Sequence, residues 1–260
     1  MIKEKEYEYF LEVAEERNED LEEISKLIKN ENANLPLLYS DIEFDETILG
    51  ITNFLINKDV IESKKNFYKA TLAREWIYNS YDNNSFKIDR CEVTTYVYKS
   101  LFYAILSGSK EKMINLAKLF GGRIEEEKDD YLPNILIGYG LKYLILGDKK
   151  NFEKYAIDFE SNKNKRGMKQ IYEGYYKTYK GILDKDEKIF NEGLKCLLKN
   201  HRANMKKNAN TIEMYFAYDS IALAILARNQ GLEITVKHEL LPIEFLENSL
   251  IDYESITLFN

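Results

Sequence analysis

The chain contains very few residues that interrupt regular structure: 3 prolines and 12 glycines among 260 residues. A β-sandwich or β-barrel reverses direction about every ten residues and needs glycine, proline or similar residues at those turns. Long helices need far fewer such stops. Hydrophobic residues make up 45% of the chain and charged residues 31%, the balance of a folded globular protein. The sequence therefore predicts an all-α fold with a substantial core.

Apolar residues recur three and four positions apart along most of the chain, which is the spacing of one helix face. From about residue 92 a longer repeat is visible. Three similar segments occupy residues 103–108, 143–148 and 179–184, and the tyrosines that open them are 40 and then 36 residues apart. Each segment closes an aromatic-rich helix and is followed by a polar turn and a second amphipathic stretch. Near the N-terminus, Pro36 predicts an extended connection over residues 32–40.

Two helices per repeat of about 34–45 residues are typical of α-solenoids of the tetratricopeptide or HEAT kind. Glycine inside a helix costs about 1 kcal/mol relative to alanine and is tolerated where a neighbouring helix approaches closely. The first helices of the repeats contain such residues, namely Gly138, Gly140, Gly174 and Gly181. We expect stacked antiparallel helical hairpins that form a degenerate solenoid.

The pattern indicates a single domain over residues 1–260. Residues 1–85 are expected to form N-terminal helices, residues 90–230 the hairpin repeats and residues 231–260 a C-terminal cap. The segment 221–227 within a helix predicted over 211–229 is apolar on all sides, which predicts a central, buried helix. One very short extended segment is expected near residues 233–237.

The charge balance bears on partners and location. Asp and Glu number 44 against 37 Lys and Arg, so the formal net charge is −7 and phosphate backbones are repelled. The basic runs Lys163–Lys169 and Lys199–Lys207 are interpreted as solvated helix ends. The longest uncharged stretches span eleven residues, short of the roughly 20 that cross a membrane, and no secretion signal is evident. We expect a cytoplasmic protein that binds neither nucleic acid nor membrane.

Motifs for enzymatic chemistry are missing from the sequence. His201 and His238 are the only histidines, and Pro242 occupies the second histidine position of a metalloprotease motif that begins at His238. No phosphate-binding loop and no nucleophile elbow occurs. No catalytic residue, metal or cofactor is therefore expected, and the chain is predicted not to be an enzyme.

Two constellations keep an enzymatic alternative open. Cys196 and His201 lie about a turn and a half apart on one predicted helix and are candidates for a nucleophile–base pair. Asp219 lies on an apolar helix stripe, where a carboxylate is either a perturbed acid or a structural group. The structural interpretation is favoured, with Asp219 bonded to a lysine, arginine or tyrosine of a neighbouring helix.

Two groups of residues are candidates for binding a protein partner. An acidic run lies on the predicted loop between the first and second hairpins, where rim charges accelerate association. Its members are Glu125, Glu126, Glu127, Asp129 and Asp130. The second group consists of tyrosines, a residue type enriched at interface hot spots. Its members are Tyr139, Tyr172, Tyr175 and Tyr176.

The string AYDSIALAILARNQGLEITVKHELLPIEFL at residues 217–246 resembles the end of the Imm49-type immunity proteins of bacterial polymorphic toxin systems. The shared pattern is an Ala/Leu-rich helix, an Ala-Arg-x-x-Gly-Leu ending and a later Leu-Pro pair. The positions that match are Ala227, Arg228, Gly231, Leu232, Leu241 and Pro242. The resemblance extends over about residues 90–248.

That resemblance implies an all-helical antidote that binds a cognate secreted toxin in the cytoplasm and neutralises it by steric and electrostatic blocking. It transfers no toxin-contacting residue, because the matching positions look like fold determinants. The alternative is a tetratricopeptide-like scaffold or regulator that holds a peptide or protein in an open inner groove. Whether the chain is a monomer or a homodimer is left open by the sequence.

Overall fold

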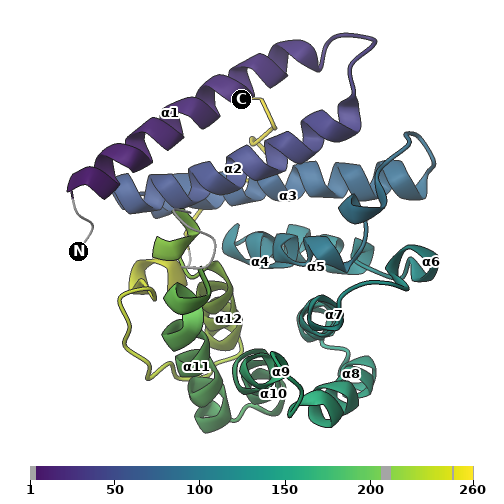
Figure 1. The fold of residues 1–260 in the computed structure, drawn as a ribbon. Coiled ribbons are helices and arrows are strands. Elements are labelled where there is room, and N and C mark those ends of the chain that lie inside the picture. The colour runs from purple at the N-terminus through teal and green to yellow at the C-terminus, as the bar shows by residue number, and fades with distance from the viewer. Residues whose placement is uncertain (1–3, 206–211, 248, 260) are drawn as a thin grey trace.

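The computed structural model describes residues 4–205, 212–247 and 249–259, and every regular element within them is helical (Figure 1). The all-α class predicted from the sequence is therefore confirmed. The start of the helix predicted over 211–229 and the end of the basic run Lys199–Lys207 lie outside these residues. Among the described residues, no helix is long and apolar enough to cross a lipid bilayer.

Three long antiparallel helices form the N-terminal layer: α1 (Glu4–Leu27), α2 (Leu35–Asn57) and α3 (Val60–Asp82). Helix α2 packs between the other two, and α1 packs chiefly on α2. Only Phe10 and Ile24 of α1 are buried, so most of this helix faces solvent. The extended connection predicted over 32–40 is wrong, because α2 begins at Leu35 and holds Pro36 in its first turn, where no backbone N–H is needed.

Helical hairpins follow in sequence order, as the repeat predicts. Helices α4 and α5 form the first, α7 and α8 the second, and α10 and α11 the third. A short helix α6 joins the first two hairpins, and α9 runs through a π-helical turn at residues 172–176 into α10. The bounds are Lys99–Leu106 (α4), Lys110–Leu119 (α5), Ile124–Glu127 (α6), Leu132–Leu146 (α7), Lys149–Asn162 (α8), Met168–Ile171 (α9), Lys177–Asp184 (α10) and Glu187–Met205 (α11).

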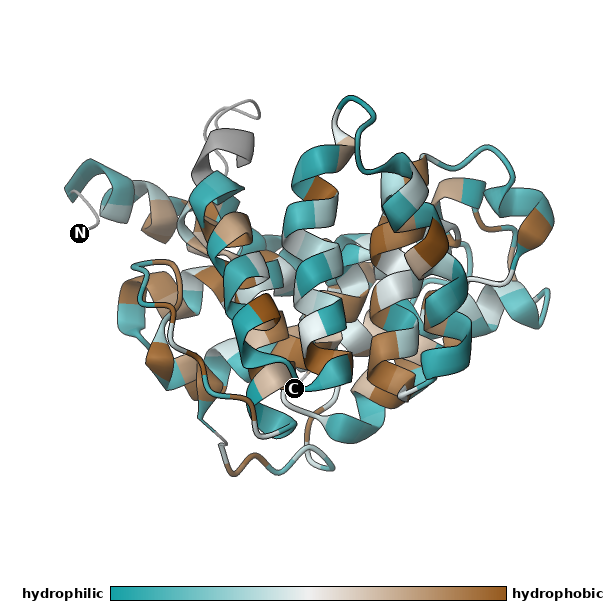
Figure 2. Ribbon diagram, turned by 90° about the horizontal axis from the view of Figure 1, so that it is seen from below, coloured by the Kyte–Doolittle hydropathy of each residue, from teal (hydrophilic) through white to brown (hydrophobic). Residues whose placement is uncertain are grey.

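Helix α12 (Tyr218–Asn229) then brings the chain back to the centre of the molecule. It packs there against α4, α10 and α11. Since α4 also contacts α7, and α7 contacts α10, these four inner helices touch one another in a closed cycle. Residues on all sides of α12 are buried, which confirms the predicted central helix. This arrangement differs from an extended solenoid, in which each repeat contacts only its sequence neighbours. Figure 2 shows hydrophobic and hydrophilic residues alternating along the helices, so that each helix has stretches of both kinds.

The glycines of the repeat helices lie where neighbouring elements approach most closely. A Cβ atom on Gly181 would lie 2.4 Å from the backbone nitrogen of Phe190 in α11, and one on Gly138 would lie 2.5 Å from the ring of Phe120. Real Cβ atoms do not approach other atoms this closely. The close packing expected at these positions is therefore confirmed.

The C-terminal residues run over the surface of the molecule, and those that the structure describes form no β-strand. The extended segment predicted near 233–237 lies along α11, where the Asn191 side chain accepts from the Thr235 N–H at 2.8 Å and donates to the Glu233 carbonyl at 2.9 Å. A 3-10 turn at Ile243–Leu246 follows. Farther on, the Tyr253 hydroxyl donates to the Ser107 carbonyl at 2.7 Å, which fastens the end of the chain to the first hairpin.

Candidate functional site

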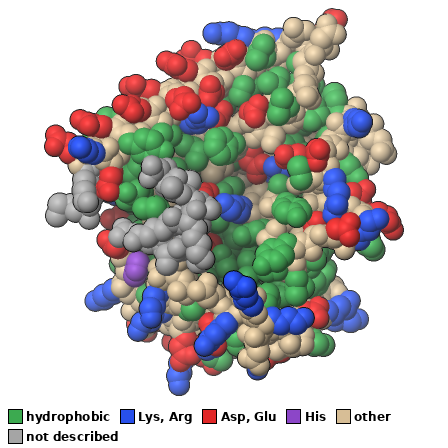
Figure 3. All heavy atoms as spheres, viewed as in Figure 1, with side chains coloured by type: hydrophobic (Ala, Val, Ile, Leu, Met, Phe, Trp, Pro, Cys, Tyr) green, Lys and Arg blue, Asp and Glu red, His purple; other side chains and the backbone are tan. Residues whose placement is uncertain are grey.

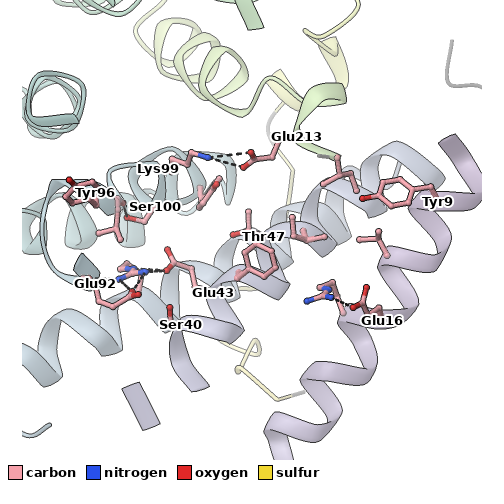
Figure 4. A pocket seen from close by; sticks show the side chains of 18 residues that line it. Tyr9, Glu16, Ser40, Glu43, Thr47, Glu92, Tyr96, Lys99, Ser100 and Glu213 are labelled. Atoms are coloured by element: carbon pink, nitrogen blue, oxygen red, sulfur yellow. Dashed lines mark hydrogen bonds and ion pairs between the residues drawn. The ribbon is translucent and has the colours of Figure 1, made fainter. Parts of the chain in front are cut away.

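A groove of about 570 Å³ lies between the N-terminal layer and the first hairpin (Figure 4). One wall comes from α1 and α2, and the other comes from residues 92–103 and the 3-10 turn Ile212–Tyr215. We refer to it as the α1–α2 groove. Figure 3 shows hydrophobic side chains gathered in the hollow below α1 on this face of the molecule. The volume lies within the range of protein sites that hold a small ligand or side chains of a partner.

Three exposed aromatic side chains stand around the groove. Tyr9 of α1 is 40% exposed, Phe44 of α2 is 57% exposed, and Tyr96 of the opposite wall is 53% exposed. Large aromatic side chains are costly to leave in water, and a cluster of them on a soluble surface marks an interaction site. These three residues were not predicted from the sequence as site residues. Phe44 gave no signal of exposure, since Ile48 and Ile51 follow it at the spacing of one apolar helix face.

The floor of the groove is an ion network centred on Arg74 of α3. Its Nε donates to Glu43 Oε2 at 2.7 Å, and both terminal nitrogens lie 3.1 Å from Glu92 Oε2. Nη1 also donates to the Glu92 carbonyl at 2.6 Å. Burial raises the pKa of Glu43, although Arg74 opposes the shift. Burial alone would lower the pKa of Arg74, but the Glu43 carboxylate raises it overall. Both carboxylates bind the one guanidinium, so the network joins α3 to α2 and to the opposite wall.

Further polar groups line or support the walls. Arg17 Nη1 of α1 lies 3.1 Å from Asp45 Oδ1 of α2, and Lys99 Nζ lies 3.2 Å from Glu213 Oε1 across the opposite wall. Burial raises the pKa of Asp45 to about 6, while Arg17 lowers it. Thr47 is 4% exposed, and among the described residues its hydroxyl has no hydrogen-bond partner. Figure 4 shows its side chain projecting from α2 toward the side of the groove that holds Lys99.

A second buried carboxylate lies between α2 and α3. The Asn66 amide donates to Glu46 Oε2 at 2.6 Å, and Lys69 Nζ lies 3.5 Å from Oε1. Burial raises the pKa of Glu46 to about 7, despite opposing contributions from Lys69 and Asn66. The folded protein therefore binds this proton more tightly than the unfolded chain does. The stability that this provides is fully present below about pH 4.5 and is lost as the pH rises through about 7.

Replacing Glu46 with glutamine should remove this pH dependence. The net shift, which already includes the opposing contribution of Lys69, corresponds to about 3 kcal/mol. We expect Glu46→Gln to be about 3 kcal/mol more stable than the wild type at pH 8, with a smaller difference at pH 5, in urea unfolding. The exposed Glu19→Gln serves as the control. A Glu46→Gln effect that is the same at both pH values would contradict the prediction.

The acidic run divides into internal and external members. Glu127 is buried and accepts from the Tyr139 hydroxyl and from the Arg123 N–H at 3.1 Å. The Asp130 carboxylate is fully buried and accepts from the Thr95 hydroxyl and N–H at 2.6 and 2.8 Å. Glu126 accepts from the Tyr81 hydroxyl. Glu125 and Asp129 are exposed.

The candidate tyrosines are mainly packing residues. Tyr139 and Tyr176 are buried, at 8% and 7% exposure. The Tyr172 hydroxyl donates to Glu160 at 2.7 Å, and the Tyr175 hydroxyl donates to Asp219 at 2.6 Å. The structure therefore brings Tyr139 to the acidic run through Glu127, but places Tyr172 and Tyr175 against other carboxylates. A partner-binding role for these tyrosines and the acidic run stays a prediction.

The two constellations considered for catalysis are engaged in structural contacts. Asp219 accepts from Tyr175 and also from the Ser220 N–H at 2.6 Å, as a structural carboxylate would. Burial raises the pKa of Cys196, which is the opposite of an activated thiol. The Cys196 Sγ accepts from the Asn200 amide, and the His201 Nε2 lies 2.8 Å from the Glu213 carbonyl oxygen. No group of three or more metal-ligand side chains is found among the described residues.

Comparison with known families gives one match. The model of the family Immunity protein 49 (Imm49) matches residues 141–245, which run from within α7 to the 3-10 turn after α12. The match confirms the resemblance drawn from the sequence. Neither the curated proteins nor the solved structures that were compared match the chain.

Proposed function

We propose that the chain is an immunity protein that binds a cognate secreted bacterial toxin in the cytoplasm and blocks it by steric and electrostatic complementarity. The observation that carries this proposal is the Immunity protein 49 match over residues 141–245. Proteins of this kind act by binding, so the proposal requires a preformed surface and no reaction chemistry.

The architecture supports a binding role. The matched residues include α10 and α12 and the end of α7, which belong to the closed cycle of inner helices, as well as the outer helices α8 and α11. Such a cycle holds its surface loops and outer helices in fixed positions, which lowers the entropic cost of association. The N-terminal layer α1–α3 lies outside the match and packs on it, since the rings of Phe54 and Phe67 contact that of Phe216.

The alternative of a tetratricopeptide-like peptide scaffold has less support. That mode needs an open inner groove, whereas α12 packs back onto α4 and occupies the inner side of the hairpins. Catalysis also has little support, because Asp219, Cys196 and His201 are each bonded to structural partners.

Growth rescue tests the proposal directly. The full chain is co-expressed with each toxin encoded beside its gene, and with a toxin from an unrelated system as the control. We expect one neighbouring toxin to lose its toxicity and to co-purify with the chain, while the unrelated toxin stays active. If the chain neither protects against nor binds any neighbouring toxin, the proposal is wrong.

A further inference from the structure

We infer, on the basis of the proposed function, that the toxin docks on the acidic face of α1 and the adjoining α1–α2 groove. The surface that it presents is basic and carries an apolar or aromatic side chain that enters the groove.

Helix α1 holds the whole charge imbalance of the protein. Its residues Glu4–Leu27 include 10 of the 44 acidic residues and 3 of the 37 basic residues. The net charge of α1 is therefore −7, equal to that of the chain, and the other residues are balanced at 34 of each sign. The negative electrostatic potential of the protein is thus concentrated at one helix. This potential attracts a basic partner to that helix.

The acidic residues form a stripe beside the groove. Glu12, Glu16, Glu19 and Glu23 follow one another at spacings of four, three and four, which places them on one helix face. All four are exposed, and Glu16 lines the groove together with Tyr9 and Val13. Figure 3 shows acidic side chains along α1 at the edge of the hydrophobic hollow.

This stripe weakens the helix that holds it. Like charges four residues apart destabilise an isolated helix by about 0.2–0.5 kcal/mol per pair, and Glu12–Glu16 and Glu19–Glu23 are two such pairs. Glu16 is offset by Arg17, whose Nη2 lies 2.5 Å from its carboxylate, but α1 buries only Phe10 and Ile24 and the other three glutamates of the stripe gain no such pair among the described residues. A role in stability therefore does not account for the stripe, whereas binding to a cationic surface does.

The groove supplies the apolar part of the site. Exposed Tyr9, Phe44 and Tyr96 surround it, and aromatic faces also attract arginine and lysine. Thr47, whose buried hydroxyl has no partner among the described residues, belongs to the lining of the same groove. An acidic edge beside an aromatic-lined hollow fits a basic protein segment that combines cationic and apolar side chains.

The same charge disfavours other occupants. A second copy of the chain would bring two helices of net charge −7 together, and nucleic acids and anionic membranes would be repelled.

The test uses the purified full chain and the toxin identified by growth rescue, with the dissociation constant measured at low and high salt. The triple variant Glu12→Lys/Glu19→Lys/Glu23→Lys reverses three exposed charges, and Phe44→Ala removes an exposed aromatic ring. We expect the triple variant to bind about 100-fold more weakly, mainly through slower association, and Phe44→Ala about 10-fold more weakly through faster dissociation. The wild-type complex should weaken as salt is added.

A matched control changes the same number of exposed charges elsewhere. Glu111→Lys/Asp158→Lys/Glu192→Lys places them on α5, α8 and α11, away from α1 and from the acidic run. We expect less than about threefold loss of affinity, with the circular dichroism of all variants unchanged.

If the control loses as much affinity as the α1 triple variant, or Phe44→Ala loses none, the inference is wrong. A change in self-association of the α1 triple variant with unchanged toxin affinity would also overturn it. In each of these cases the wild type still binds its toxin, so the proposed function stands; a wild type that binds no toxin refutes that function instead.

Discussion

Replacing Arg74 with methionine is expected to lower the free energy of unfolding by about 3–5 kcal/mol. The substitution leaves the Glu43 carboxylate, whose side chain is only 10% exposed, without its counter-charge. It also removes the donors to the side chain and the carbonyl of Glu92. Equilibrium unfolding in urea at pH 7 measures the loss. The α1–α2 groove should be disturbed as well, because Arg74 and both of its partners line it.

Two controls separate the buried network from ordinary surface charge. The double variant Glu43→Gln/Arg74→Met removes both buried charges, and should recover most of the lost stability because no unpaired ion remains. Lys65→Met breaks a pair with Glu62 whose side chains are 38% and 44% exposed, and should cost less than about 1 kcal/mol. A loss below about 1 kcal/mol for Arg74→Met would mean that the network contributes little.

The substitution Gly181→Ala is expected to lower the free energy of unfolding by about 3 kcal/mol. The added methyl group would meet the backbone nitrogen and Cα of Phe190 at 2.4 and 2.6 Å. A backbone cannot rotate away as a side chain can, so α10 and α11 must separate along their contact. Urea unfolding measures the loss in free energy, and the intensity of tyrosine circular dichroism in the near ultraviolet reports on the packing.

Gly174→Ala is the matched control within the same hairpin. There the new methyl group would meet the end of the Leu197 side chain at 2.6 Å, and that side chain can adopt another rotamer. We expect Gly174→Ala to stay within about 1 kcal/mol of the wild type, since alanine also favours the helix. Equal losses for the two variants would contradict the interpretation that backbone contact is the cause.

The sequence predicts the helical class and the hairpin order because both follow from local patterns. Apolar periodicity, scarce breakers and the spacing of Tyr103, Tyr143 and Tyr179 report on neighbours along the chain. The return of α12 to α4 is a contact between distant segments, and no local pattern encodes it. Similarly, Pro36 fits both an extended connection and a first helical turn, and the fold selects the second.

The candidate groove could not be predicted for the same reason. Its walls come from four separate stretches of the chain, including Tyr9, Phe44, Tyr96 and Glu213. The buried charges of α2 were also missed, because a run such as Asp45-Glu46 is usually solvated. Here α2 is covered by α1 on one side and α3 on the other, so its carboxylates meet Arg17, Asn66 and Arg74 instead of water.

The return of α12 has a consequence for how the protein is made. The rings of Phe102 and Tyr103 in α4 pack against Tyr218 at centroid separations of 5.9 and 5.6 Å. A chain emerging from the ribosome must therefore release nearly all of its length before α4 is covered, and truncation ahead of α12 would leave that apolar surface bare. Folding of the inner helices should accordingly be a late, all-or-none event.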